Sequence, residues 1–503
     1  MSADAAQISS GAGRLREASS SRRSLSARFG EARLGWPATV GALCFAVTAY
    51  LSRYLFWDSY LDLTGGRYVA HHGIPRHEAL TTAAQRNWID QQWLAHWIYY
   101  EVWTLGGYPL VAAVSSLLVA SAFALLCALL LTRGVPAQRA FLWTLIAFIA
   151  CFGNTVIRAQ SFAYPLFVLL LWAILADSRR PRARFLLVIP LLILWSNLHG
   201  TVLLGIMLVV GYSSVRMLLA ARARRLDRVV IYGTAVVGAF AALSANPYGV
   251  SIVDYYRALI GNPVVAHYIV EWAPPSLGNL ASFGFFAVLF IVIAVTAYGI
   301  GRGCRPTPTL VAIVSFLTLL AAQGVRYQAW FAMAGAVLAA ETLAAVRPSP
   351  PELAMPMQRL GALAILLAGV GAVGVLSRTS DRTFESLVPR GAMSAAAAYV
   401  ETHPRAKILA DDQTSSALLW LYPQTLGHVA FDARLEQYPH GRLRSWFTYL
   451  NTSSPGWPTL AARYDVVVAS RAAHPSLVTG LEKLTGWRTI AADKDGVALV
   501  REH

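Results

Sequence analysis

The chain has 503 residues, of which 56% are hydrophobic and only 14% are charged, and its formal net charge is +16. Soluble domains carry about 25% charged residues, so this composition excludes a soluble globular protein, with or without a single anchor helix. The basic excess does not indicate nucleic-acid binding. Only three residues are lysines, and the arginines fall in short clusters between apolar runs rather than along one continuous stripe.

The N-terminal segment, residues 1–34, is rich in serine, alanine and arginine, and we expect a disordered basic tail there. An apolar run follows it. No small-residue cleavage site comes between this run and Arg53 with the aromatic residues behind it, so a cleaved signal peptide is not expected. We therefore predict that the run is retained as a first membrane span.

Apolar stretches near the roughly 20 residues that a helix needs to cross a bilayer recur along residues 35–377. They predict an α-helical polytopic membrane domain with about eleven transmembrane helices. The stretches are 35–55, 109–131, 140–157, 162–176, 185–197, 200–216, 229–245, 281–300, 309–323, 328–346 and 360–377.

Arginine is shared unequally between the two sides that these spans define. One side, which includes the N-terminus, has 21 arginines, whereas the other has seven before residue 378. Cytoplasmic loops of membrane proteins carry the excess of basic residues. The asymmetry predicts a cytoplasmic N-terminus and a periplasmic or extracellular C-terminus, in a multi-pass protein of a bacterial inner (plasma) membrane.

The last segment, residues 378–503, differs in character from the spans. Short apolar runs at 407–411, 428–432, 465–470 and 496–501 are typical of buried strands, and helical patterns separate them at 395–402, 415–421 and 475–484. Alternation of strands and helices predicts a small α/β domain outside the membrane.

The first outer loop, residues 57–93, is too long for a simple connector. Asp58 stands at the end of the first predicted span and Asp62 follows one helical turn later, so we predict both as catalytic residues. A carboxylate at a membrane boundary is desolvated, which adapts it to proton abstraction or metal binding. Asp58 with Glu78 is the candidate set for a divalent metal ion. Alternatively, Asp58 only caps a helix.

Other outer connections hold polar residues that are unusual beside apolar helices, and ionisable groups at such positions are functional candidates. Two of them are arginines, which suit a phosphate or pyrophosphate. They serve equally well as interfacial anchors. The predicted substrate-binding residues are Arg158, Gln160, Asn197, His199, Glu271 and Arg326.

The pattern Asp58…Gly66-Arg67-Tyr68…Gly73-Ile74-Pro75, after a first span and within a long outer loop, resembles the GT-C superfamily of membrane glycosyltransferases. Protein O-mannosyltransferases, oligosaccharyltransferases and aminoarabinose transferases belong to it. The resemblance implies that Asp58 is the catalytic base or a metal ligand. No adjacent Asp-Glu pair follows the first span, and no WWD-type motif occurs near the C-terminus, so the acceptor is not specified.

The expected function is that of a cell-envelope glycosyltransferase. It would move a sugar from a polyprenyl-phosphate-linked donor to an acceptor at the outer membrane face, with membrane lipids and the lipid-linked sugar as its partners. The alternatives are a transporter or lipid flippase, which predicts symmetric halves and charges near the bilayer midplane, and a non-catalytic GT-C-like protein.

Overall fold

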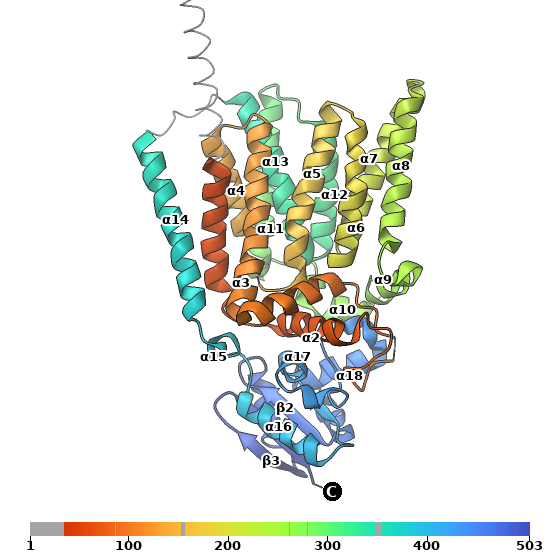
Figure 1. Cartoon of the computed structure of the whole chain (residues 1–503), viewed down its shortest axis with the longest axis vertical. Helices are drawn as coiled ribbons and strands as arrows, with labels where there is room; N and C mark the ends of the chain where they lie inside the picture. Colours follow the sequence, from red (N-terminus) through yellow and green to blue (C-terminus); the bar gives the residue numbers. More distant parts are fainter. Residues whose placement is uncertain are drawn as a thin grey trace, which may run out of the picture.

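The computed structural model describes residues 35–85, 87–151, 156–260, 262–278, 280–347 and 355–502. Apolar helices lie side by side in a bundle, and a small domain that contains a β-sheet sits at one end of it (Figure 1). The predicted tail 1–34 lies outside the described residues.

Seven helices of the described chain are long and apolar enough to cross a membrane. Four shorter apolar helices accompany them, and each of the predicted stretches overlaps one helix of these two sets. The long helices are α3 (Trp93–Thr132), α5 (Ala163–Arg179, which continues η2, Ala159–Phe162), α7 (Val202–Arg222), α8 (Leu226–Ser244), α11 (Leu280–Gly301), α13 (Gln328–Val346) and α14 (Met355–Arg378). The shorter ones are Gly35–Leu51, α4 (Ala137–Ala150), α6 (Val188–Leu198, preceded by η3, Ala183–Leu187) and α12 (Pro308–Gln323).

Helix α3 is bent within its 40 residues. Gly106 and Gly107 leave helical geometry, with φ of +64° at Gly107, and Pro109 follows two residues later. A positive φ is readily adopted only by glycine, and proline begins a new helical segment well. The bend separates a first part, 93–105, from the apolar span that the sequence predicts at 109–131.

The first outer loop is partly helical, although it was predicted as a loop. It contains α2 (Trp57–His72), which lies across the end of the bundle and packs along α3 (Figure 1). Short helices from other connections gather at this same end. They are η2 (Ala159–Phe162), η4 (Gly249–Ser251), α9 (Ile252–Ile260), α10 (Pro263–Tyr268), η5 (Val270–Trp272) and η6 (Val325–Tyr327).

The C-terminal domain has a four-stranded mixed sheet in the order β1-β2-β4-β3, in which only β1 and β2 are parallel. Its strands are β1 (Ile408–Ala410), β2 (Val466–Ser470), β3 (Trp487–Ala492) and β4 (Gly496–Arg501). Its helices are α15 (Asp381–Phe384), α16 (Arg390–Thr402), α17 (Asp412–Leu421), η7 (Pro423–Thr425), η8 (Leu435–Gln437), α18 (His440–Leu450), η9 (Trp457–Thr459), η10 (Ala461–Arg463) and α19 (Pro475–Leu481).

Two strand predictions need correction. The run 428–432 is not a strand and makes one isolated bridge, between Val429 and Ile408. Its other edge is taken by the first outer loop, where the amides of Thr82 and Ala83 donate to the carbonyls of Val429 and Ala430 at 2.9 and 3.0 Å. Strand β3 was not predicted because its residues are half-exposed and Arg488 and Thr489 interrupt its apolar residues, so its sequence has no buried apolar run.

Candidate active site

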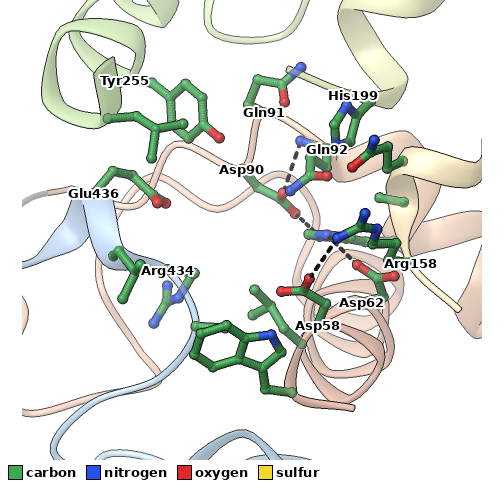
Figure 2. A pocket seen from close by; sticks show the side chains of 18 of the residues that line it. Asp58, Asp62, Asp90, Gln91, Gln92, Arg158, His199, Tyr255, Arg434 and Glu436 are labelled. Carbon is green, nitrogen blue, oxygen red and sulfur yellow. Dashed lines mark hydrogen bonds and ion pairs between the residues drawn. The ribbon is translucent and has the colours of Figure 1, made fainter. Parts of the chain in front are cut away.

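A cavity of about 140 Å³ lies between the end of the helical bundle and the C-terminal domain. Its lining comes from α2, the loop before α3, η2, η5 and η6 on the membrane side and from η8 on the domain side. Figure 2 shows acidic and basic side chains turned toward this space from opposite walls. Segments far apart in the sequence therefore build one polar chamber.

Asp58 and Glu271 share one guanidinium at this cavity. Arg158 Nη1 lies 2.8 Å from Glu271 Oε1 and 3.9 Å from Asp58 Oδ2. The Arg158 side chain is only 7% exposed, while the two carboxylates keep 38% and 46% of their side-chain surface, which faces the cavity. Arg158 is thus a fixed buried charge that holds two partly accessible carboxylates.

The surroundings shift the pKa values of these two carboxylates in opposite directions. Burial raises the pKa of Asp58 to about 7, against the lowering effect of Arg158, and Glu271 adds to the rise. The pKa of Glu271 is held below its usual value, chiefly by Arg158. A carboxylate with a pKa near neutrality accepts and releases protons effectively, whereas Glu271 stays ionised as the partner of the arginine.

Asp62, one turn along α2, faces a different partner from Asp58. His96 Nε2 lies 3.2 Å from Asp62 Oδ1, and His96 Nδ1 lies 3.0 Å from Asp90 Oδ2, with all three side chains buried. Each ring nitrogen therefore faces a carboxylate oxygen, which favours the doubly protonated imidazolium. The Asp62–His96–Asp90 group ties α2 to α3 and to the loop before it.

Two adjacent glycines allow α2 to lie so close to α3. A Cβ added at Gly65 would come within 2.7 Å of His96 Nδ1, and one at Gly66 within 2.1 Å of the His96 carbonyl oxygen. Both distances are below van der Waals contact, so larger residues would push the helices apart. The glycines explain why Asp62 reaches His96 at all.

Three more of the predicted substrate-binding residues line the cavity: Gln160, His199 and Arg326. The Arg326 guanidinium stacks 3.9 Å above the Trp272 ring, a cation–π contact that orients it. Burial lowers the pKa of His199 well below its usual value, with Arg326 and Arg158 adding to the effect. The Thr201 amide donates to His199 Nδ1 at 3.2 Å, so a neutral His199 carries its proton on Nε2.

Asn197 and Glu78 are not among the residues that line this cavity. Asn197 Oδ1 accepts a hydrogen bond from Trp93 Nε1 at 2.9 Å, and its amide donates to the carbonyls of Ile193 and Ala245, so it joins helices. Glu78 pairs with Arg434 at 2.8 Å and accepts the amides of Leu80 and Thr81. The structure does not bring Glu78 to Asp58.

The donors at this cavity do not fit a divalent metal ion. Glu78 is committed to Arg434, and the guanidinium of Arg158 already serves both Asp58 and Glu271. Within the described ranges, a set of three closely spaced potential ligands occurs only at Asp411, Asp412 and His474 in the C-terminal domain. Glu78 therefore has a different partner from Asp58, and the metal set predicted from the sequence stays a prediction.

Several lining residues were not predicted. Asp90, Gln91 and His96 belong to the polar run that closes the first outer loop, and Arg434 and Glu436 come from the C-terminal domain. Burial raises the pKa of Glu436 to about 7. The polar run before α3 was a usable signal, because such residues are unusual next to a span. Nothing local distinguishes Glu436.

Comparison with known proteins places the fold. No protein-family model and no curated protein match the sequence. The archaeal oligosaccharyltransferase AglB from Archaeoglobus fulgidus, in complex with an inhibitory peptide and a dolichol-phosphate, matches with a TM-score of 0.53 and 11% identity, over 93% of this chain and 74% of that one. An Archaeoglobus fulgidus oligosaccharyltransferase in the apo form gives a TM-score of 0.50 and 12% identity, with the same coverage.

The chain has a GT-C-like fold. ArnT from Cupriavidus metallidurans bound to undecaprenyl phosphate also matches, with a TM-score of 0.47 and 13% identity over 92% of this chain and 97% of that one. The structural similarity to GT-C enzymes expected from the first outer loop is confirmed. At such low identity the similarity concerns the fold alone, so activity and residue roles must be argued from the cavity itself.

Proposed function

We propose that this GT-C-like protein is a glycosyltransferase that moves a sugar from a polyprenyl-phosphate-linked donor to an acceptor at the outer face of the membrane. The observation that carries the proposal is Asp58, whose pKa is raised to about 7, facing a polar cavity beside Arg158. AglB, to which the fold is similar, was solved with a dolichol-phosphate.

In the proposed reaction, Asp58 takes the proton from an acceptor hydroxyl as that oxygen forms a bond to the anomeric carbon of the donor sugar. The bond between this carbon and the phosphate oxygen breaks, and the lipid phosphate leaves with the electron pair. Arg326 lies in the same lining, stacked on Trp272 and without a carboxylate partner among the described residues. A guanidinium so placed stabilises the departing phosphate.

The proposed arrangement in the membrane has eleven spans, a cytoplasmic N-terminus and a C-terminal domain on the periplasmic or extracellular side. The seven long and four shorter apolar helices support this number. The arginine-rich connections, such as the one between α7 and α8, lie at the end of the bundle opposite the C-terminal domain (Figure 1), as the positive-inside rule requires.

The charge distribution favours an enzyme over a transporter. A transporter site is expected near the bilayer midplane, between repeated halves. Here the cavity charges gather at one end of the bundle, under the C-terminal domain. A polar chamber between the bundle and an outer domain suits a reaction at the membrane surface more than it suits passage through the membrane.

The experiment is transfer of a labelled sugar from a polyprenyl-phosphate carrier by the purified protein, with Asp58→Asn as the test variant. Loss of a general base reduces rates typically 10²–10⁴-fold, and we expect a reduction of about that size. The matched control is Asp381→Asn, which neutralises an exposed carboxylate of α15 and should leave the rate unchanged.

Full transfer by Asp58→Asn would remove the proposed base. Movement of labelled lipid without a covalent product, equal in the wild type and in Asp58→Asn, would favour a transporter or flippase. No transfer and no movement in a folded wild type, with any polyprenyl-linked sugar offered, would favour a non-catalytic protein.

A further inference from the structure

A second cavity, of about 290 Å³, lies at the end of the bundle opposite the C-terminal domain. It forms where α3, α5 and α13 end and where α12 begins, with the α11–α12 connection at its edge (Figure 1). Three arginines line it: Arg133, Arg179 and Arg305. The reaction proposed above uses none of them.

Arg133 is the structural member of the three. Its side chain is 4% exposed and pairs with Glu341 of α13, with Nη2 at 3.0 Å from Oε2. It also donates to the Leu175 carbonyl at 3.3 Å and to the Thr307 hydroxyl at 3.5 Å. Arg133 thereby joins α3, α5, α12 and α13, and it neutralises the carboxylate of Glu341.

Arg179 and Arg305 are different. Both are exposed at the cavity, and neither has an ion-pair partner among the residues that the structure describes. Three arginines against the single carboxylate of Glu341 leave an excess of two positive charges around a hollow. Guanidinium groups are well suited to binding phosphate oxygens through paired hydrogen bonds.

One wall of this cavity is partly apolar. On α13 it has Leu338, Ala344 and Ala345 beside Glu341 and Thr342. A free phosphate ion would have no use for such a wall, whereas a lipid places its headgroup against basic residues and its glycerol and upper acyl chains against apolar ones. Basic pockets between membrane helices on the cytoplasmic side are typical headgroup sites.

We propose that this cavity binds the phosphate group of an anionic phospholipid through Arg179 and Arg305, with the apolar part of the lipid against α13. Bound phosphate would connect the end of α5 to the α11–α12 connection, next to the Arg133–Glu341 pair. The site is separate from the proposed catalytic cavity, so it stands whether or not the protein transfers a sugar.

The test measures lipid binding by the purified full chain, delipidated in a neutral detergent. Phosphatidylglycerol, phosphatidylcholine and inorganic phosphate are titrated separately, and bound lipid is followed by native mass spectrometry and by the thermal midpoint Tm. We expect saturable phosphatidylglycerol binding that raises Tm. Because each arginine near the surface contributes a few-fold to anionic-lipid affinity, R179A/R305A should weaken binding by about 30-fold.

The matched control is R184A/R222A, which removes two exposed arginines from the same end of the bundle outside this cavity. It should keep wild-type affinity. If the alanine pair does not fold, R179Q/R305Q tests the same charges with longer side chains. Wild-type affinity in a folded R179A/R305A or R179Q/R305Q, an equal loss in the control, or equal protection by phosphatidylcholine would overturn the proposal. Complete displacement of the lipid by millimolar inorganic phosphate would instead assign the cavity to a free ion.

Discussion

Arg158 is the residue that pairs with two carboxylates of the proposed catalytic cavity. Its guanidinium contacts Glu271 closely and Asp58 more loosely, at 2.8 and 3.9 Å. A buried arginine with a single partner would hold that carboxylate fully ionised. Because Arg158 is shared between two carboxylates, it stabilises the ionised form of Asp58 less. The effect of burial is then the larger one, and it raises the pKa of Asp58. The unequal distances separate a permanent anion from a titratable base.

The pKa of about 7 at Asp58 predicts the pH dependence of transfer. A base works only when deprotonated, so the rate should fall about tenfold for each pH unit below about 7 and level off above it. In Arg158→Gln the charge that lowers the pKa of Asp58 is lost, and the falling limb should move to higher pH. Initial rates of sugar transfer from about pH 5 to about pH 9 measure both effects. A wild-type rate that stays level down to about pH 5 would contradict the raised pKa.

Helix α2 is the element that delivers both aspartates to their positions. The spacing of four residues places Asp58 and Asp62 on one face, and the close contact with α3 aims that face at Arg158 and His96. Gly65 and Gly66 permit this contact because no side chain stands between the two helices. The position of the two aspartates is therefore set by glycines, which have no reactive side chain of their own.

Gly66→Ala tests this dependence. The added Cβ would meet the backbone carbonyl of His96 and the Cβ of Tyr100, at 2.1 and 2.6 Å, and neither can turn away as a flexible side-chain end could. We expect a destabilisation of about 1–3 kcal/mol, typical of overpacking, and a loss of transfer activity of tenfold or more as Asp58 shifts. Thermal unfolding and transfer rates measure the two effects.

The control for that variant is Gly371→Ala in α14, where an added Cβ meets nothing within 4 Å. It should be neutral or slightly stabilising, because alanine is the better helix former. Wild-type stability and activity in Gly66→Ala would mean that α2 is not held by this contact.

The whole molecule joins its C-terminal domain to the membrane part through backbone and side chains. The loop residues Thr82 and Ala83 bond to the domain backbone, Gln413 Nε2 donates to the Leu55 carbonyl at 2.9 Å, and Arg434 pairs with Glu78. Glu436 from the same domain completes the cavity wall. The domain is thus part of the site and not an appendage.

Topology is the prediction that belongs to this scale. Reporter fusions after residues 180 and 222 should report a cytoplasmic location, and a fusion at residue 503 should report the opposite side, because 21 arginines lie in the connections of one side and seven in those of the other. A cytoplasmic C-terminus would mean that the chain crosses the membrane an even number of times, and the outer-face reaction would then be excluded.

The helices of the membrane part were predictable because the signal is local. A membrane span must satisfy all of its backbone hydrogen bonds within lipid, and a long apolar run does so as an α-helix. Each predicted stretch accordingly overlaps a helix. Three of the four predicted strands were also found. Strand β3 was not predicted because its side chains are half-exposed. Segment 428–432 forms only one isolated bridge, and the first outer loop donates backbone hydrogen bonds to it.

The sequence by itself determined the membrane character, the positions of the helices and the gathering of odd polar residues in the outer connections, because composition and periodicity are properties of neighbouring residues. Only the tertiary structure decided which of these residues meet. In the folded protein Asp62 contacts His96, and Arg158 pairs with both Asp58 and Glu271. Glu78 pairs with Arg434, and Glu436 lines the cavity. These contacts join positions up to several hundred residues apart, and they depend on how α2 and the C-terminal domain pack on the bundle, which no local pattern records.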